Sequence, residues 1–297
     1  MEAAMGGWIE TYRGAVWPRD CDVVEHMTIS AYVERFGDAN LALFEAVGMG
    51  LGYMERERRA LAAVEANVQF HRELRVGDVM HVEGGITGTE GKIVGIGHRL
   101  IDSANGEVVT SYRQKSVHFD LDARKSVALS GDRRRALEAA RVEWAEPLPQ
   151  VRPYPADDTG FFATARDTAK PWEIDILGHL SFHFHVQRFS MAAGQALAAM
   201  GMNGEYLRHS RHGMSTFEIE LKFLREAGAG DLLSIRSGLV HLGATSFRLV
   251  HHMVNERLGT LAAVMSQFGV HLDMDARRPA PFPAELRARC EALLVGA

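Results

Sequence analysis

The stretch RDCDVVEHM, residues 19–27, has a near copy in WEIDILGHL, residues 172–180. In both stretches a histidine follows an aspartate by four positions, and a segment with apolar residues at helical spacing comes directly afterwards. Asp22 and Asp175 are 153 positions apart (175 − 22), and so are the two histidines. The organisation of the whole chain follows from this recurrence.

The same offset continues through most of each half. It superimposes Phe70-x-Arg72-Glu73 on Phe223-x-Arg225-Glu226, Gly77-Asp78 on Gly230-Asp231, and Gln114-x-x-Val117-His118 on Gln267-x-x-Val270-His271. An unbroken offset of this length indicates a duplication in which the loops kept their lengths, and a period this long indicates two domains rather than a solenoid. We predict domains at residues 1–142 and 161–297, joined by an exposed, proline-rich linker at residues 143–160.

Each half has the same expected order of elements: a strand and turn, one long helix, then several strands. In the first half, residues 28–49 have apolar side chains at helical spacing and end near a glycine. The residues after that helix alternate as strands do, at 62–74, 79–88, 92–102 and 107–122. Because the connections are short, we expect antiparallel strands with the helix packed across one sheet face, which is an α+β fold.

A long helix wrapped by an antiparallel sheet and preceded by Asp-x-x-x-His resembles the hotdog fold, and more narrowly its 4-hydroxybenzoyl-CoA thioesterase-like branch. The residues that carry the resemblance are Asp22, His26-Met27 and Tyr32 in the first half, and Asp175 and Gly178-His179-Leu180 in the second. Through YVERFGDANLALF (32–44) and FEIELKFLREAGAGD (217–231), the chain is also similar to thioesterase domains of carnitine and betaine breakdown.

The resemblance implies an acyl-CoA thioesterase made of two tandem hotdog domains. Sites in this family form between two protomers, so it implies a pseudo-dimer within one chain, with a homo-oligomer of such chains as a further expectation. It implies no metal and no redox cofactor, because coenzyme A arrives as part of the substrate.

Thioester hydrolysis needs a base or nucleophile, and donors for the developing oxyanion. Asp22 and Asp175 are the candidates for the first role, either as a base toward water or as a nucleophile that forms an anhydride. The amides of Glu25-His26 and Gly178-His179, expected at the helix start, are the candidate oxyanion donors. The alternative is that both aspartates only cap the helices that follow.

The histidines of the two turns have two open roles. His26 and His179 either act in catalysis, by orienting the acid or by donating to the thioester carbonyl, or hold the turn by a structural hydrogen bond. The resemblance also assigns Gly178, Met27 and Tyr32 to substrate binding.

A second carboxylate is expected on the strand after the helix. Glu65 and Glu218 occupy equivalent positions there and could face the same cleft. The alternative is that each is solvated or paired with a nearby arginine, Arg72 or Arg225.

The two halves differ within the motif. Glu25 stands where the family has glycine, and His185 in the second half stands where the first has Tyr32. These differences leave open whether both copies are active.

Cys21 is rejected as a nucleophile. Its neighbours Asp20 and Asp22 raise the pKa of a thiol. Its counterpart Ile174 is apolar, so we expect Cys21 to point into the core. At the position equivalent to Asp20 the second half has another acid, Glu173. A turn exposed to solvent would explain an acid at both positions.

A metal site is also rejected. His179 and His183 have the four-residue spacing of helical zinc ligands, but no glutamate base follows them as in metalloproteases. We expect the strand histidines to be satisfied structural residues; they are His118, His251, His252 and His271.

The composition is that of a soluble globular protein. Hydrophobic residues make up 46% and charged residues 24% of the 297 residues, and the net charge is −5. This charge does not favour nucleic acid or an anionic membrane as a partner. Two cysteines and an N-terminus without a signal-peptide pattern favour a cytoplasmic protein.

Three functions remain compatible with these features. The first is acyl-CoA thioester hydrolysis, with an acyl group that the sequence does not determine. The second is hydration or dehydration of a 3-hydroxyacyl-CoA, although the usual hydratase signature is absent. The third is non-catalytic acyl-CoA binding, which the divergence between the halves would favour.

Overall fold

The computed structural model describes residues 7–146 and 152–296 of the chain. The chain forms two compact units, Met1–Pro149 and Gln150–Ala297. The division falls within the segment expected to be the linker, of which residues 147–151 lie outside the described residues.

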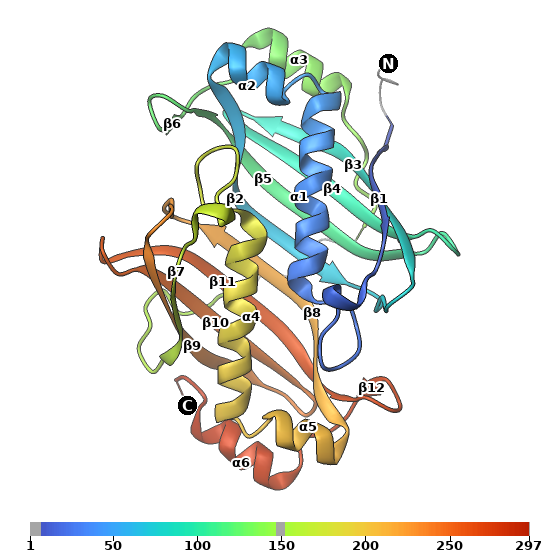
Figure 1. The fold of residues 1–297 in the computed structure, drawn as a ribbon, viewed down its shortest axis with the longest axis vertical. Helices are drawn as coiled ribbons and strands as arrows, with labels where there is room; N and C mark the ends of the chain where they lie inside the picture. The colour runs from blue at the N-terminus through green and yellow to red at the C-terminus, as the bar shows by residue number, and fades with distance from the viewer. Residues whose placement is uncertain (1–6, 147–151, 297) are drawn as a thin grey trace. The chain divides into compact units, whose positions relative to one another are not determined.

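The first unit is built around one long helix and an antiparallel sheet (Figure 1). Its helices are α1 (Ile29–Ala46), α2 (Leu51–Glu57) and α3 (Gly131–Ala139), and its strands are β1 (Ile9–Ala15), β2 (Arg59–Phe70), β3 (Val79–Glu90), β4 (Ile93–Asp102), β5 (Val108–Asp120) and the short β6 (Lys125–Ser126). The long strands lie in the order β1-β3-β4-β5-β2, and each neighbouring pair is antiparallel.

The second unit repeats this architecture (Figure 1). Its helices are α4 (Phe182–Ala199), α5 (Gly204–Ser210) and α6 (Ala284–Ala292), and its strands are β7 (Phe162–Thr168), β8 (His212–Phe223), β9 (Leu232–Leu242), β10 (Ser246–Asn255), β11 (Thr260–Asp273) and the short β12 (Arg278–Pro279). The strand order is β7-β9-β10-β11-β8, again antiparallel throughout. The predicted α+β class is confirmed in both halves.

The duplication extends to the register of the strands. In the pairing of β2 with β5, the register shifts between Ala63 and Glu65, which leaves Val64 as an extra residue. In the pairing of β8 with β11, Phe217 is the extra residue, and it is the counterpart of Val64. A bulge at the same position in both copies shows that they share backbone geometry as well as sequence.

The long helices bury one face, as their apolar spacing predicts. The buried apolar side chains of α1 include Val33, Phe36 and Leu43, and those of α4 include Val186 and Phe189. Three- and four-residue steps place such side chains on one side of a helix, where they are removed from water. α1 and α4 have 18 residues each, and no described helix is long and apolar enough to cross a membrane.

The short helices α2, α3, α5 and α6 have no clear signal in the sequence. They are seven to nine residues long, so each shows only about two turns of periodicity. In the first unit, Tyr53 of α2 and Leu137 of α3 pack in one buried cluster with Leu43 of α1. Tertiary packing therefore stabilises these helices, rather than intrinsic propensity.

A buried ion pair attaches the Asp-x-x-x-His turn of the first unit to its long helix. An Asp20 carboxylate oxygen lies 3.0 Å from the Arg35 guanidinium of α1, and the two side chains are only 5% and 6% exposed. The other Asp20 oxygen accepts the Trp17 N–H at 2.9 Å, and the Asp20 carbonyl accepts the Thr28 N–H at 2.8 Å. Both ends of the turn are thereby tied to each other and to the helix.

The second unit has the equivalent pair. Glu173 Oε2 accepts from Arg188 Nη2 and from the Lys170 N–H, both at 2.7 Å, and the Glu173 carbonyl accepts the Ser181 N–H at 2.8 Å. The solvated-turn interpretation of Asp20 and Glu173 is therefore wrong. Both acids are buried because each has a guanidinium and a backbone N–H as partners.

Arg35→Met removes the guanidinium partner of a buried carboxylate, so we expect it to lower the free energy of unfolding by about 3–5 kcal/mol. Urea unfolding followed by tryptophan fluorescence measures this. Arg13→Met, which removes an exposed partner of Glu10, is the control and should have little effect. The double variant Asp20→Asn, Arg35→Met should recover part of the loss. If Arg35→Met proves as stable as Arg13→Met, the pair does not hold the turn.

Candidate active site

The Asp-x-x-x-His turn is closed by hydrogen bonds between its own residues. In the first unit, Asp22 N–H donates to the His26 carbonyl and Glu25 N–H donates to the Asp22 carbonyl, both at 3.1 Å. Asp22 Oδ1 accepts the Val24 N–H at 2.9 Å. The second unit repeats the two backbone bonds at 2.8 and 3.0 Å. The turn therefore holds its aspartate and histidine on one short loop.

The aspartates of the turn do not cap the long helices. The N-cap of α1 is Thr28, whose hydroxyl accepts the Ala31 N–H at 3.2 Å, and the N-cap of α4 is Ser181. Asp22 and Asp175 lie six residues before these caps. The capping alternative is therefore wrong.

The candidate oxyanion amides belong to the turn and not to the first turn of the helix, which corrects their predicted position. Gly178 N–H donates to the Asp175 carbonyl at 3.0 Å, and His179 N–H donates to Asp175 Oδ1 at 3.1 Å. In the first unit, Glu25 N–H donates to the Asp22 carbonyl in the same way. Of the four candidates, the His26 N–H is the one that donates to no acceptor within the described chain.

The turn requires a left-handed backbone residue directly before the histidine. Gly178 has φ 79°, and its counterpart Glu25 has φ 67°. A side chain at Gly178 would meet no atom within 4 Å, so the dihedral angle, and not space, favours glycine there. Glu25 adopts a conformation that is strained for a residue with a side chain, on the order of 1 kcal/mol.

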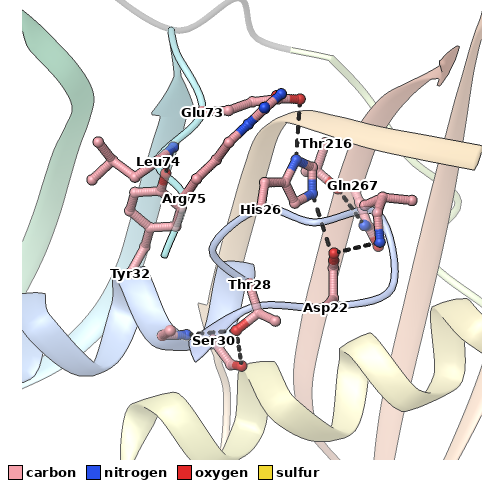
Figure 2. A network of polar contacts seen from close by, with 12 residues as sticks. Asp22, His26, Thr28, Ser30, Tyr32, Glu73, Leu74, Arg75, Thr216 and Gln267 are labelled. Carbon is pink, nitrogen blue, oxygen red and sulfur yellow. Dashed lines mark hydrogen bonds and ion pairs between the residues drawn. The ribbon is translucent and has the colours of Figure 1, made fainter. Parts of the chain in front are cut away.

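In the first unit the His26 imidazole lies between two carboxylates (Figure 2). Its Nδ1 is 3.1 Å from Glu73 Oε1, and its Nε2 is 3.5 Å from Asp22 Oδ2. Glu73 follows the end of β2, so the site joins the turn before α1 to the strand after it. The His26 side chain is 13% exposed and that of Asp22 is 35% exposed. The histidine is enclosed, whereas the aspartate reaches solvent.

The two carboxylates keep His26 charged. Burial lowers the pKa of the imidazole, but the hydrogen bonds to Asp22 and Glu73 outweigh burial and raise the pKa to about 9. His26 is therefore an imidazolium at neutral pH, which makes it a proton donor rather than a base. A base at this turn has to be a carboxylate, and Asp22 is the more exposed of the two.

Arg75 extends this row of charges. Its Nη2 lies 3.8 Å from Glu73 Oε2, so negative and positive side chains alternate from Asp22 to Arg75 (Figure 2). The counterpart of Arg75 in the second unit is Gly228, which has no charge to contribute.

The second unit keeps the histidine–glutamate contact but arranges it differently. His179 Nε2 lies 3.1 Å from Glu226 Oε1, whereas in the first unit Nδ1 faces the glutamate. Asp175 Oδ1 accepts two N–H groups, those of Leu177 at 2.8 Å and of His179 at 3.1 Å. The two turns therefore share a backbone and differ in how their side chains are held.

Glu65 and Glu218 form ion pairs on β2 and β8. Glu65 lies 2.8 Å from Lys115 Nζ, and Glu218 lies 3.0 Å from an Arg152 nitrogen. These partners are not the arginines expected from the sequence. Glu65 also lies five residues before the end of β2, roughly 17 Å along the strand from the segment that carries Glu73. The assignment of either glutamate to catalysis stays a prediction.

Met27 and Tyr32 are buried beside the turn, and their assignment to substrate binding stays a prediction. Met27 is buried, and its N–H donates to the Leu74 carbonyl at 2.8 Å. The Tyr32 hydroxyl accepts the Leu74 N–H at 3.1 Å, and its ring packs edge-on against Phe70. Both residues hold the turn and α1 against the chain next to Glu73.

The surroundings of the Cys21 thiol and of the His185 imidazole keep both groups uncharged at neutral pH. Burial raises the pKa of the Cys21 thiol, and the neighbouring Asp22 and Asp20 raise it further. We expected Cys21 to point into the core, whereas the structure shows it only half-buried. His185 is buried, with Nδ1 3.2 Å from the Ser181 carbonyl, and burial lowers its pKa to about 4. Within residues 7–146 and 152–296 no group of three His, Cys, Asp or Glu side chains is placed to hold a metal ion.

Two of the strand histidines have the same structural partners in each unit, as predicted. His118 Nε2 lies 2.8 Å from the Tyr53 hydroxyl, and His271 Nε2 lies 2.8 Å from the Tyr206 hydroxyl. In both residues the other ring nitrogen bonds to a backbone carbonyl.

Glu73 is the residue of this site that was not predicted. It recurs as Glu226 in the Phe-x-Arg-Glu motif, so the repeat itself was a usable signal. Its contact with His26 spans 47 residues of sequence, and only the tertiary structure brings the two together.

Both halves match one protein family. Residues 16–144 and 169–290 match the Thioesterase-like superfamily. A betainyl-CoA thioesterase of Pseudomonas aeruginosa is 31% identical over 123 residues, which are 41% of this chain and 77% of that protein. An L-carnitine dehydrogenase/betainyl-CoA thioesterase of Rhizobium meliloti is 28% identical over 119 residues, which are 40% of this chain and 23% of that protein.

The fold is similar to that of a solved thioesterase that covers nearly the whole chain. The 12:0-ACP thioesterase of Umbellularia californica superimposes with a TM-score of 0.66 at 14% identity, over 88% of this chain and 93% of that one. The expected tandem hotdog fold and the expected similarity to betaine and carnitine thioesterases are confirmed.

The charged state of His26 predicts a pH dependence of stability. Its folded pKa of about 9 lies above the ordinary 6.5, so its contribution is complete below pH 6.5 and is lost as the pH rises through 9. Between pH 6.5 and pH 9, the free energy of unfolding of the wild type should fall by on the order of 3 kcal/mol more than that of His26→Gln. NMR titration of the ring should show a midpoint near 9 that Glu73→Gln lowers. A midpoint near 6.5 in the wild type would refute the enclosed imidazolium.

The backbone angle at Gly178 predicts opposite effects for two glycine substitutions. Gly178→Ala should lower the free energy of unfolding by about 1–2 kcal/mol, because it forces a side chain into the left-handed region. Gly194→Ala, in the exposed interior of α4 with open space around it, should raise it by about 0.5–1 kcal/mol. Thermal unfolding of both variants measures this, and effects of the same sign would contradict the explanation.

Proposed function

Because the chain belongs to the Thioesterase-like superfamily, we propose that it hydrolyses an acyl-CoA thioester to a free acid and CoA at the Asp22–His26 turn of the first unit. The family supplies the reaction class, thioester hydrolysis. The assignment of residues rests on the geometry and charge of the first turn.

The observation that carries the proposal is the row formed by Asp22, His26 and Glu73. Thioester hydrolysis needs a group that activates water and a proton donor for the departing thiolate. Asp22 is a solvent-exposed carboxylate, and His26 is an enclosed cation only 3.5 Å away. Glu73 holds that cation from the other side. Base and acid are therefore adjacent and coupled.

In the proposed reaction, Asp22 accepts a proton from water while the water oxygen bonds to the thioester carbonyl carbon. The carbonyl electron pair moves to its oxygen and forms the tetrahedral oxyanion. When the intermediate collapses, the C–S bond breaks and its electron pair leaves with sulfur, which takes a proton from the His26 imidazolium. Asp22 then returns its proton to His26, and both groups regain their starting states. Direct attack by Asp22 to give an anhydride uses the same residues.

The His26 N–H is the proposed oxyanion donor. It makes no hydrogen bond within the described chain, whereas the equivalent His179 N–H donates to Asp175. An unengaged amide beside a cationic ring is suited to a developing negative charge. This difference, together with Gly228 in place of Arg75, supports chemistry in the first unit rather than the second.

We propose a small, cationic acyl group for the substrate. By their printed names, the two relatives compared above act on betainyl-CoA, and the match with the first is 31% identical. Around the first turn there is one more acid than cation, because Asp22, exposed Glu25 and Glu73 stand against the charged side chains of His26 and Arg75. Negative side chains around a site favour a positively charged ligand over a neutral or anionic one.

The proposal is tested by measuring free thiol released from CoA thioesters whose acyl groups are cationic, neutral or anionic and similar in size. We expect the cationic ester to have the highest kcat/KM. Asp22→Asn should lower kcat by at least about 100-fold because it removes the base, and Asp175→Asn should leave kcat within a few-fold. Glu73→Gln should move the alkaline limb of the pH profile to lower pH, because His26 then loses its proton more readily.

Three outcomes would overturn this assignment. Loss of activity in Asp175→Asn with none in Asp22→Asn would move the chemistry to the second unit. A new enoyl chromophore without free thiol would indicate a hydratase. Saturable binding of a non-hydrolysable analogue, with no turnover of any thioester, would indicate a binding protein.

A further inference from the structure

The segment that carries Glu73 is tied to its surroundings through the next residue, Leu74 (Figure 2). The Leu74 carbonyl accepts the Met27 N–H at 2.8 Å, and Met27 directly follows His26. The Leu74 N–H donates to the Tyr32 hydroxyl at 3.1 Å. Both polar backbone groups of Leu74 are therefore bonded, one to the Asp-x-x-x-His turn and the other to α1.

Tyr32 is itself held firmly in the position that this bond requires. It lies in the first turn of α1, is 3% exposed, and packs edge-on against Phe70 with 5.2 Å between the ring centroids. Among the described residues, the Tyr32 hydroxyl is the one acceptor of the Leu74 N–H. Leu74 is 2% exposed, so water replaces that acceptor only if the segment moves.

The second unit lacks this hydrogen bond and keeps its surroundings. His185 stands in place of the tyrosine and packs edge-on against Phe223, which is the counterpart phenylalanine, at 5.1 Å. The Leu180 N–H donates to the Ala227 carbonyl at 2.7 Å, as the equivalent pair does in the first unit. The His185 ring, however, meets the Ser181 carbonyl of its own helix cap, with Nδ1 3.2 Å from that oxygen. α4 therefore makes no equivalent side-chain bond to the segment after β8 among the described residues.

The two glutamates differ in the way that this loss would produce. The Glu73 side chain is 27% exposed, whereas that of Glu226 is 47% exposed. Glu73 meets Nδ1 of its histidine and Glu226 meets Nε2. The glutamate next to the residue that a tyrosine holds is the one enclosed against its histidine.

Arg75 is a second residue near Glu73 that the other unit lacks. Its Nη2 lies 3.8 Å from Glu73 Oε2, and its side chain is 51% exposed. Solvent screens an exposed pair at this distance, so the pair holds the carboxylate only weakly. The Tyr32 bond is buried, and its loss would leave a backbone donor without an acceptor.

We infer that Tyr32 is a positioning residue of the proposed reaction, because its hydroxyl fixes the Leu74 peptide and thereby keeps the Glu73 carboxylate against the His26 ring. The role rests on the proposed function, in which the His26 imidazolium is the proton donor. Without the hydroxyl, the Leu74 N–H has to turn toward water to find an acceptor, and the adjacent Glu73 moves away from His26 with it. Tyr32 thus acts on the reaction through Glu73.

Tyr32→Phe tests the inference, because it removes the hydroxyl and keeps the ring that packs on Phe70. The charged groups that face His26 are Asp22 from the turn and Glu73 from the segment after β2. Withdrawal of Glu73 should therefore lower the midpoint of the His26 NMR titration by roughly one pH unit. The alkaline limb of the kcat profile should move to lower pH by the same amount, with KM nearly unchanged.

Two further variants separate positioning from a general loss of stability. Tyr53→Phe is the matched control, because Tyr53 is 5% exposed and its hydroxyl lies 2.8 Å from His118 Nε2 in the same unit. It loses a buried hydroxyl of the same kind and should leave the His26 midpoint unchanged. Tyr32→His installs the residue of the second unit, so it should lower the midpoint as Tyr32→Phe does, and it replaces that variant if the phenylalanine protein does not fold.

A double variant shows whether Tyr32 acts through Glu73. In a Glu73→Gln background, Tyr32→Phe should cause no further shift of the His26 midpoint, because the carboxylate that the hydroxyl positions is already gone.

The inference fails if Tyr32→Phe and Tyr32→His both titrate like the wild type, or if Tyr53→Phe shifts the midpoint as far as Tyr32→Phe. It also fails if Tyr32→Phe causes its full shift in the Glu73→Gln background. The titration needs no substrate, so it decides the inference even if the protein turns over no thioester, a result that would refute the proposed function alone.

Discussion

The buried ion pair between an acid at the entrance of each turn and an arginine on each long helix positions everything else at the site. Burying two charges is costly unless each has further hydrogen bonds, and here backbone N–H groups supply them to Asp20 and Glu173. The same residues accept a backbone N–H from the helix cap, which closes the loop. The closed loop holds Asp22 and His26 close to the segment after β2, and Glu73 lies in that segment.

The duplication provides a comparison within one molecule. The two turns share their backbone hydrogen bonds, their left-handed residue and their bulged strand, so the scaffold has been preserved in both copies. The side chains on that scaffold have diverged. In the first unit His26 is enclosed between two carboxylates, while in the second Asp175 is held by two amides. Two copies of one scaffold can take different roles only if their side chains differ, and here the side chains differ on a preserved backbone.

The elements with strong periodicity were predictable, and those without it were not. The helix expected at 28–49 is observed as Ile29–Ala46, and the expected strands overlap β2 to β5. At the site, Asp22 and His26 were identified because their spacing is local and repeated. The resemblance assigns Met27 and Tyr32 to substrate binding, and the structure adds that both side chains are buried, which a motif does not specify. The amides were placed at the helix start, because the sequence did not show that Thr28 and Ser181 are the caps.

The sequence by itself determined the duplication, the α+β class and the acid–histidine pair, because each depends on the order and spacing of residues along the chain. Tertiary structure alone decided that Glu73 completes the pair and that Asp20 and Glu173 are buried rather than solvated. It also decided that His26 is charged, since its pKa depends on two carboxylates that approach only after folding. Contacts across 47 residues and the dielectric environment they create are properties of packing, which a linear pattern does not contain.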